Sequence, residues 1–259
     1  LTITNSLPSH SVRITSTVGD KGFYSMGANN YGLIYENPNA SLFLSGMIFD
    51  GLSMGLINGL SSAVGDTIQY CDFSNNITGI HLVGLQYSPL ISNCTFSQND
   101  LGAYFEVSSP KVMDCRFLAC DVGIRTELAT STAGGIYDSI FSCGEIGIVS
   151  RGSNQRVTDN KFYTNTGILN HSGSILNMGN LAKNLFEAER ENLKFQDTAS
   201  YTARVQLYEG HNDFYHKNPG LLNPSFDFHF DSNWYVSPPP KSNAIKASYN
   251  WFEGIGKHL

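Results

Sequence analysis

Charge is scarce in this chain, and the motifs of several common enzyme classes are missing. Only 15% of the 259 residues are charged, and the formal net charge is −6. Nucleic-acid binding needs a basic surface, so this composition gives no electrostatic basis for it. No Cys-x-x-Cys or Cys/His spacing predicts a metal site, and no Gly-x-Ser-x-Gly motif or phosphate loop predicts a hydrolase or nucleotide enzyme. We therefore expect neither metal nor cofactor.

Long apolar runs and helical periodicity are also absent. The most apolar stretch, residues 41–65, is interrupted by Asp50 and by several glycines and serines, so we expect no membrane insertion. No segment sustains apolar residues at i, i+3, i+4 and i+7 over several turns, which argues against a helical fold. The chain starts at Leu1 without a signal peptide, and we expect a mature product or a part of a longer chain or larger complex.

The chain does contain a motif that recurs eight times. Each copy is centred on a phenylalanine, often with a Cys, Ser or Asn two residues before it and a Gly five or six residues after it. Successive copies are 21 to 28 residues apart. A period in this range indicates stacked units, each unable to bury its apolar face alone. The anchors are Phe49, Phe73, Phe96, Phe117, Phe141, Phe162, Phe186 and Phe214.

The residues around each anchor predict short β-strands, because apolar positions alternate and Asn and Gly lie where the chain must turn. The Leu/Asn consensus of leucine-rich repeats, which have a similar period, is absent. The motif N/C-x-F-x-x-N-x-x-x-G-I resembles the repeat of the pectate-lyase-like superfamily over roughly residues 45–220. The resemblance implies an all-β fold, a right-handed parallel β-helix of about 8–10 coils, but it does not specify a function.

The repeat divides the chain into three parts. We expect irregular N-terminal coils over residues 1–44, regular coils over 45–225 and a capping segment over 226–259. The charge-dense stretch 187–194 predicts a short helix or a loop outside the coil. The run Pro238–Pro240 prevents regular strand pairing, and a cap would cover the open sheet edge of the last coil.

Stacking places equivalent residues of neighbouring coils about 4.8 Å apart, so repeated side chains form columns. We interpret the repeated polar residues as structural, and Cys71, Cys94 and Cys115 as small buried side chains. Cys120 and Cys143 are the one pair that we consider for a disulfide. One predicted column holds Cys71, Cys94, Cys115, Ser139, Asn160, Asn184 and Asn212, and the other holds Asn76, Asn99 and Asn165.

The strand after the repeat glycine gives the candidate ligand-binding face. We expect Ile80, Ala103, Ile124, Ile148 and Ile168 to point inwards, so the next residue and the one two further on point outwards. Two carboxylates with arginine and an aromatic ring suit glycoside hydrolysis or sugar binding. The alternative, which we favour, is a cross-coil ion pair between Glu127 and Arg151 on a wet sheet. The predicted wall contains His81, Tyr104, Glu106, Arg125, Glu127, Arg151 and His171.

Three functional hypotheses follow, and none assigns a catalytic residue. The first is a non-catalytic module of an extracellular or bacterial cell-surface protein, which presents a binding or structural surface as an adhesin, a stalk or a carbohydrate-binding part. Its partner would be a polysaccharide or another surface protein. The second is a polysaccharide lyase or glycoside hydrolase with a divergent site on the wall. The third is a cargo or subunit of a larger surface or secretion assembly. The Asn-Thr-Asp, Asp-Asp, Gly-His-Gly and Arg-x-Lys series expected of polygalacturonase-like hydrolases is absent, which favours the first.

Overall fold

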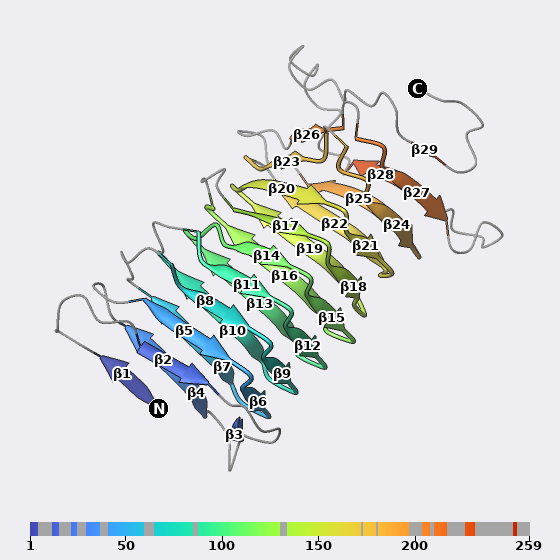
Figure 1. The fold of residues 1–259 in the computed structure, drawn as a ribbon. Helices are drawn as coiled ribbons and strands as arrows, with labels where there is room; N and C mark the ends of the chain where they lie inside the picture. Colours follow the sequence, from blue (N-terminus) through green and yellow to red (C-terminus); the bar gives the residue numbers. More distant parts are fainter. Residues whose placement is uncertain are drawn as a thin grey trace.

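The chain is wound into a solenoid whose coils stack along one axis, and their strands form three parallel β-sheets (Figure 1). The computed structural model describes residues 1–4, 12–15, 22–24, 30–36, 41–59, 65–84, 88–129, 134–171, 173–179, 181–196, 204–207, 210–216, 226–230 and 251–252. No helix occurs among these residues. Sheets A and C have 10 strands each, and sheet B has nine. The parallel β-helix that the repeat predicts is therefore confirmed.

Each coil contributes one strand to each sheet in the order A, B, C, except the last, whose described strands lie only in sheets A and C. Sheet A contains β1 (Thr2–Thr4), β4 (Tyr31–Glu36), β7 (Met54–Gly59), β10 (Thr78–Val83), β13 (Leu101–Glu106), β16 (Val122–Glu127), β19 (Ile146–Arg151), β22 (Thr166–His171), β25 (Glu191–Gln196) and β28 (Phe226–Phe230). Sheet B contains β2 (Val12–Thr15), β5 (Leu42–Ser45), β8 (Thr67–Gln69), β11 (Leu90–Ser92), β14 (Lys111–Met113), β17 (Gly135–Tyr137), β20 (Asn154–Thr158), β23 (Ile175–Asn177) and β26 (Arg204–Gln206). Sheet C contains β3 (Gly22–Tyr24), β6 (Ile48–Asp50), β9 (Asp72–Ser74), β12 (Thr95–Ser97), β15 (Arg116–Leu118), β18 (Ile140–Ser142), β21 (Lys161–Phe162), β24 (Leu185–Ala188), β27 (Asp213–His216) and β29 (Trp251–Phe252).

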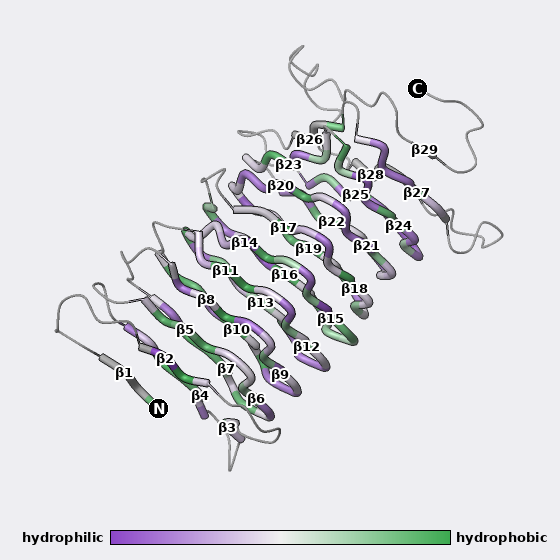
Figure 2. The backbone as a smooth tube through the Cα atoms, in the orientation of Figure 1, coloured by the Kyte–Doolittle hydropathy of each residue, from purple (hydrophilic) through white to green (hydrophobic). Residues whose placement is uncertain are grey.

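The anchor phenylalanines form the predicted column through the core. All eight are fully buried. Neighbouring rings stack with centroids 4.6 to 5.1 Å apart. The sequence reading missed Phe23, which extends the column by one ring at 5.0 Å from Phe49. Hydrophobic and hydrophilic segments recur at the same place from coil to coil, as this register requires (Figure 2).

The repeat glycine is needed for close approach between coils. A Cβ atom on Gly102 would lie 2.6 Å from the carbonyl oxygen of Gly123 and 2.8 Å from a ring carbon of Phe117. Any side chain there would collide with the backbone of the next coil and with the phenylalanine column. This contact explains why glycine recurs five or six residues after the anchor.

The polar column before the anchors is a continuous hydrogen-bond ladder. The Asn184 carboxamide accepts from the Asn160 backbone N–H at 3.0 Å, and Asn160 accepts from the Ser139 N–H at 3.0 Å. Ser139 Oγ accepts in turn from the Cys115 N–H at 3.1 Å. Each of these side chains satisfies a buried backbone donor of the preceding coil, as predicted.

The second column behaves similarly, with one correction. Asn99 Nδ2 donates to the Phe73 carbonyl at 2.9 Å, and Asn76 makes the equivalent bond to Phe49. The prediction for Asn165 is wrong, because that residue is half-exposed. Its coil is one residue shorter, so the buried position falls to Thr164, which is 2% exposed.

All five cysteines are buried free thiols, so the disulfide considered between Cys120 and Cys143 is wrong. The thiols of these two residues donate to the carbonyls of Phe96 and Phe117, at 3.6 and 3.8 Å. Each thiol therefore donates to a carbonyl of the preceding coil, as asparagine does in the second column. Burial raises the pKa of both thiols. Hydrogen bonding between stacked thiols raises the pKa of Cys94, with burial a further cause.

The charge-dense stretch 187–194 belongs to the coil, so the predicted helix or outside loop is wrong. It lies in β24 and β25, whose strands pair in register with those of the preceding coil. Glu191 is only 8% exposed, and it accepts from Thr166 Oγ1 at 2.7 Å and from Lys194 Nζ at 3.5 Å. Its charge is thus accommodated within sheet A without interrupting the repeat.

The two ends of the chain are described only in part. Where they are described, residues of the predicted irregular N-terminal coils form β1 to β5 and join the three sheets. In the predicted cap, β28 pairs with β25 and β29 pairs with β27. The run Pro238–Pro240 lies outside the described residues, as does Gly220, the glycine six residues after the anchor Phe214. The three-part division of the chain stays a prediction.

Candidate binding face on sheet A

The predicted wall lies on the outward face of sheet A. The five residues expected to point inwards are fully buried, which fixes the direction of their neighbours. The register places His81 beside Tyr104, and Tyr104 beside Arg125, in one outward row. A second row holds Glu106, Glu127 and Arg151, on β13, β16 and β19.

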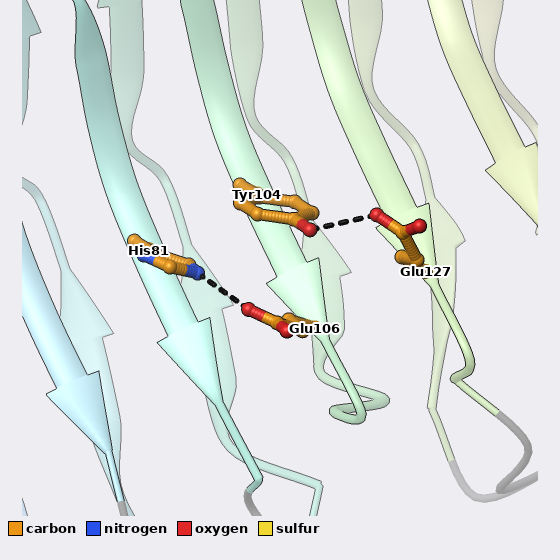
Figure 3. A network of polar contacts seen from close by, with 4 residues as sticks. All are labelled: His81, Tyr104, Glu106 and Glu127. Atoms are coloured by element: carbon orange, nitrogen blue, oxygen red, sulfur yellow. Dashed lines mark hydrogen bonds and ion pairs between the residues drawn. The ribbon is translucent and has the colours of Figure 1, made fainter.

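Four of the seven predicted residues form two bonded contacts between adjacent coils (Figure 3). His81 Nε2 lies 3.3 Å from Glu106 Oε2. The Tyr104 hydroxyl donates to Glu127 Oε2 at 2.7 Å. The His81 and Tyr104 rings also stack on each other, with centroids 4.6 Å apart and planes 13° apart. Three coils are thus joined by one continuous set of side-chain contacts.

The environment of Tyr104 sets the direction of its hydrogen bond. Burial, followed by the hydrogen bond to Glu127, raises the pKa of Tyr104 to about 12. The hydroxyl is therefore protonated at neutral pH and donates to the carboxylate. This contact occupies one oxygen of Glu127, whereas the Glu106 side chain is 42% exposed.

The ion pair considered between Glu127 and Arg151 is wrong, since no ion pair joins them although both are described. Tyr104, on the other side of β16, binds Glu127 instead. Arg125 is half-buried, and its Nε atom has no hydrogen-bond partner. His171 lies at the end of β22, two coils beyond Glu127. These three basic residues share the face but lie outside the bonded network.

The network offers hydrogen-bond acceptors and little metal-binding capacity. Within the described ranges, no group of three or more His, Cys, Asp and Glu side chains is arranged to hold a metal ion. Glu106 and Glu127 are direct neighbours in the sheet register, which sets their backbones about 4.8 Å apart. The face therefore presents two adjacent carboxylates, each in contact with one ring of the stacked pair His81 and Tyr104.

A column of three aspartates was missed by the sequence reading. Asp114, Asp138 and Asp159 each lie one residue before the polar ladder and are exposed. Partial burial, and then the carboxylates of Asp159 and Asp114, raise the pKa of Asp138. The constant offset from the ladder residues was the signal available in the sequence. The column has no second feature that would indicate a ligand.

The sheet topology and the stacked columns define a right-handed β-helix protein with a polar outward face on sheet A. A family model described as the right-handed beta helix region matches residues 32–186. This is more than half of the chain, and the chain belongs to that family. No curated protein and no solved structure matches the chain. Among the described residues, no helix is long and apolar enough to cross a membrane.

Proposed function

We propose that this chain is a non-catalytic β-helix module that binds a polysaccharide along the outward face of sheet A, as part of a secreted or cell-surface protein. The observation that carries the proposal is the bonded network on three adjacent coils, in which two carboxylates lie side by side at the surface. Carboxylates are strong acceptors for the hydroxyl donors of a sugar.

The fold supports binding to an extended ligand. Equivalent positions recur about every 4.8 Å along the axis, so a polymer that follows the axis meets one outward side chain of each row at every coil. The Tyr104 hydrogen bond holds Glu127 in one position before any ligand arrives. Such preorganisation reduces the entropy lost on binding.

The exposure of Glu106 favours binding over catalysis. The general acid of a glycosidase is usually shielded from water in an apolar setting. The Glu106 side chain is instead 42% exposed and is contacted by His81. No catalytic motif of the hydrolases considered above accompanies it in the sequence.

A glycoside hydrolase is the second candidate function, and the observation in its favour is the register of β13 and β16. Glu106 and Glu127 are neighbours in adjacent strands. A backbone separation of about 4.8 Å brings the two carboxyl groups to the roughly 5 Å of retaining glycosidases if both side chains lean together. The same experiment separates the two functions.

The test is a panel of pectins, alginates and neutral polysaccharides, assayed for binding and for turnover with the full chain. We expect binding without turnover, and a 10- to 100-fold weaker affinity in Glu127→Gln, on the order of a lost charge-assisted hydrogen bond. Glu187→Gln, which alters a half-buried carboxylate on sheet C, is the matched control and should bind as wild type does. Turnover that disappears in Glu127→Gln would establish the enzyme instead, and absence of binding to every glycan would refute the proposal.

A further inference from the structure

His81 and Tyr104, the aromatic residues of the wall, stack on each other, so the ring faces between them cannot pack against a sugar ring. Carbohydrates present polar hydroxyls and an apolar C–H surface, so a binding site needs both kinds of contact. The His81 and Tyr104 rings cover each other at a centroid distance of 4.6 Å. The two ring faces that meet are therefore closed to a sugar, and exposed apolar side chains near the carboxylates offer the alternative contact.

Two aliphatic residues follow those carboxylates directly in the sequence. Val107 follows Glu106 and is 51% exposed, and Leu128 follows Glu127 and is 56% exposed. Their backbone N–H groups donate to the carbonyls of Glu127 and Arg151, at 2.8 and 2.9 Å. These bonds fix both residues at the edge of sheet A, beside the bonded network.

Both residues have a backbone conformation that disfavours their side chains. Val107 has φ = 52° and Leu128 has φ = 54°, in the left-handed region. The equivalent positions in the coils before and after are Gly84 and Gly152, with φ of 64° and 54°. Glycine adopts this region freely, whereas a β-branched residue such as valine is an outlier there. Strained residues with exposed apolar side chains thus occur in the two coils that carry Glu106 and Glu127.

The neighbouring glycine also leaves room for the leucine. A Cβ atom on Gly152 would lie 3.1 Å from Leu128 Cδ2. Leu128 therefore extends toward the next coil over a position that has no side chain. Tyr70 and Leu181 are likewise exposed with positive φ, so it is the position of Val107 and Leu128 next to Glu106 and Glu127 that points to a functional contact.

We propose that Val107 and Leu128 form an apolar lip that packs against the C–H face of a pyranose ring, while Glu106 and Glu127 accept hydrogen bonds from its hydroxyls. This inference rests on the polysaccharide-binding function proposed above. It assigns two specificity-determining residues that lie outside the predicted wall, and it predicts that they are retained at a cost in stability.

The test measures stability and affinity together in Val107→Gly and Leu128→Gly. Each substitution relieves strain, so we expect a higher urea midpoint, combined with a roughly 5- to 10-fold weaker affinity for the glycan that wild type binds. Val107→Asn removes the apolar contact with a residue that tolerates the left-handed region, and should lose affinity equally. This variant separates loss of contact from the added flexibility of glycine.

Leu181→Gly is the matched control. Leu181 is 55% exposed with φ = 62°, but it precedes β24 in a different connection. We expect a higher urea midpoint with unchanged affinity. Unchanged affinity in the Val107 and Leu128 variants, with Glu127→Gln still weakened, would overturn the lip and leave the proposed function standing. If wild type binds no glycan, both are refuted.

Discussion

Asn160 provides the sharpest test of how the coils are held together. Its side chain is fully buried, and Oδ1 accepts from the Ser139 N–H at 3.0 Å. Nδ2 donates to the carbonyls of Ile136 and Thr158, at 2.9 and 2.8 Å, and approaches Asn184 Oδ1 at 3.2 Å. Asn160→Ala removes all four contacts and leaves buried groups of three coils without these partners.

The expected loss follows from these contacts. A buried polar group left unsatisfied costs about 1–3 kcal/mol, and some of the four regain partial bonds by small shifts. We therefore expect Asn160→Ala to lower the free energy of unfolding by about 3–5 kcal/mol, at the high end for a single substitution. Asn160→Ser should recover about 1 kcal/mol, because Ser139 Oγ already accepts the Cys115 N–H in this column.

The assay is urea unfolding followed by circular dichroism, with linear extrapolation to zero denaturant. Asn154→Ala is the control, since Asn154 is half-buried in β20 but outside the ladder, and should change stability by less than about 0.5 kcal/mol. A loss below about 1 kcal/mol for Asn160→Ala would show that the ladder does not stabilise the stack. A serine variant no better than alanine would show that a hydroxyl cannot replace the carboxamide oxygen at this position.

Three further predictions concern other columns. Thiol labelling of native Cys94 should be slow and should become fast after denaturation, because the residue is buried and its pKa is raised; rapid native labelling would contradict the buried ladder. Phe117→Leu should cost more stability in urea than Phe23→Leu, by about 1 kcal/mol, because Phe117 stacks on both sides and Phe23 is an end of the described column; equal losses would contradict this. Asp138→Asn should stabilise the fold by a few tenths of a kcal/mol at neutral pH, where the aspartate is charged beside its two neighbours. Because the folded-state pKa is raised, wild-type stability from this group is present below the unfolded pKa and is lost as pH rises through the folded pKa. The two proteins should therefore converge near pH 3, whereas high salt should narrow their difference only by the share that the neighbouring carboxylates cause, because burial is the larger cause of the raised pKa and is not screened. A difference independent of pH would exclude a charge effect.

The sequence by itself determined the fold class and the columns. The phenylalanine and glycine repeat is visible without a structure because each coil solves the same packing problem with the same residues. The inward direction of Ile80 and Ile124 and the outward direction of Tyr104 and Glu127 also follow, since side chains alternate along a strand. The burial of the cysteines follows from their place in the repeat.

The tertiary structure alone decided which neighbours bind each other. The sequence register places Glu127 on a coil that has Tyr104 on one neighbouring coil and Arg151 on the other. Only the side-chain geometry shows that Tyr104 is its hydrogen-bond partner. It also showed that Cys120 points to a carbonyl of its own ladder and not to Cys143. Backbone angles revealed the strain at Val107, because valine itself gives no indication of the left-handed region, which only the glycines at the equivalent positions, Gly84 and Gly152, indicate. A repeat specifies spacing along the axis, whereas contacts and strain depend on rotamers and on the turn that each coil makes.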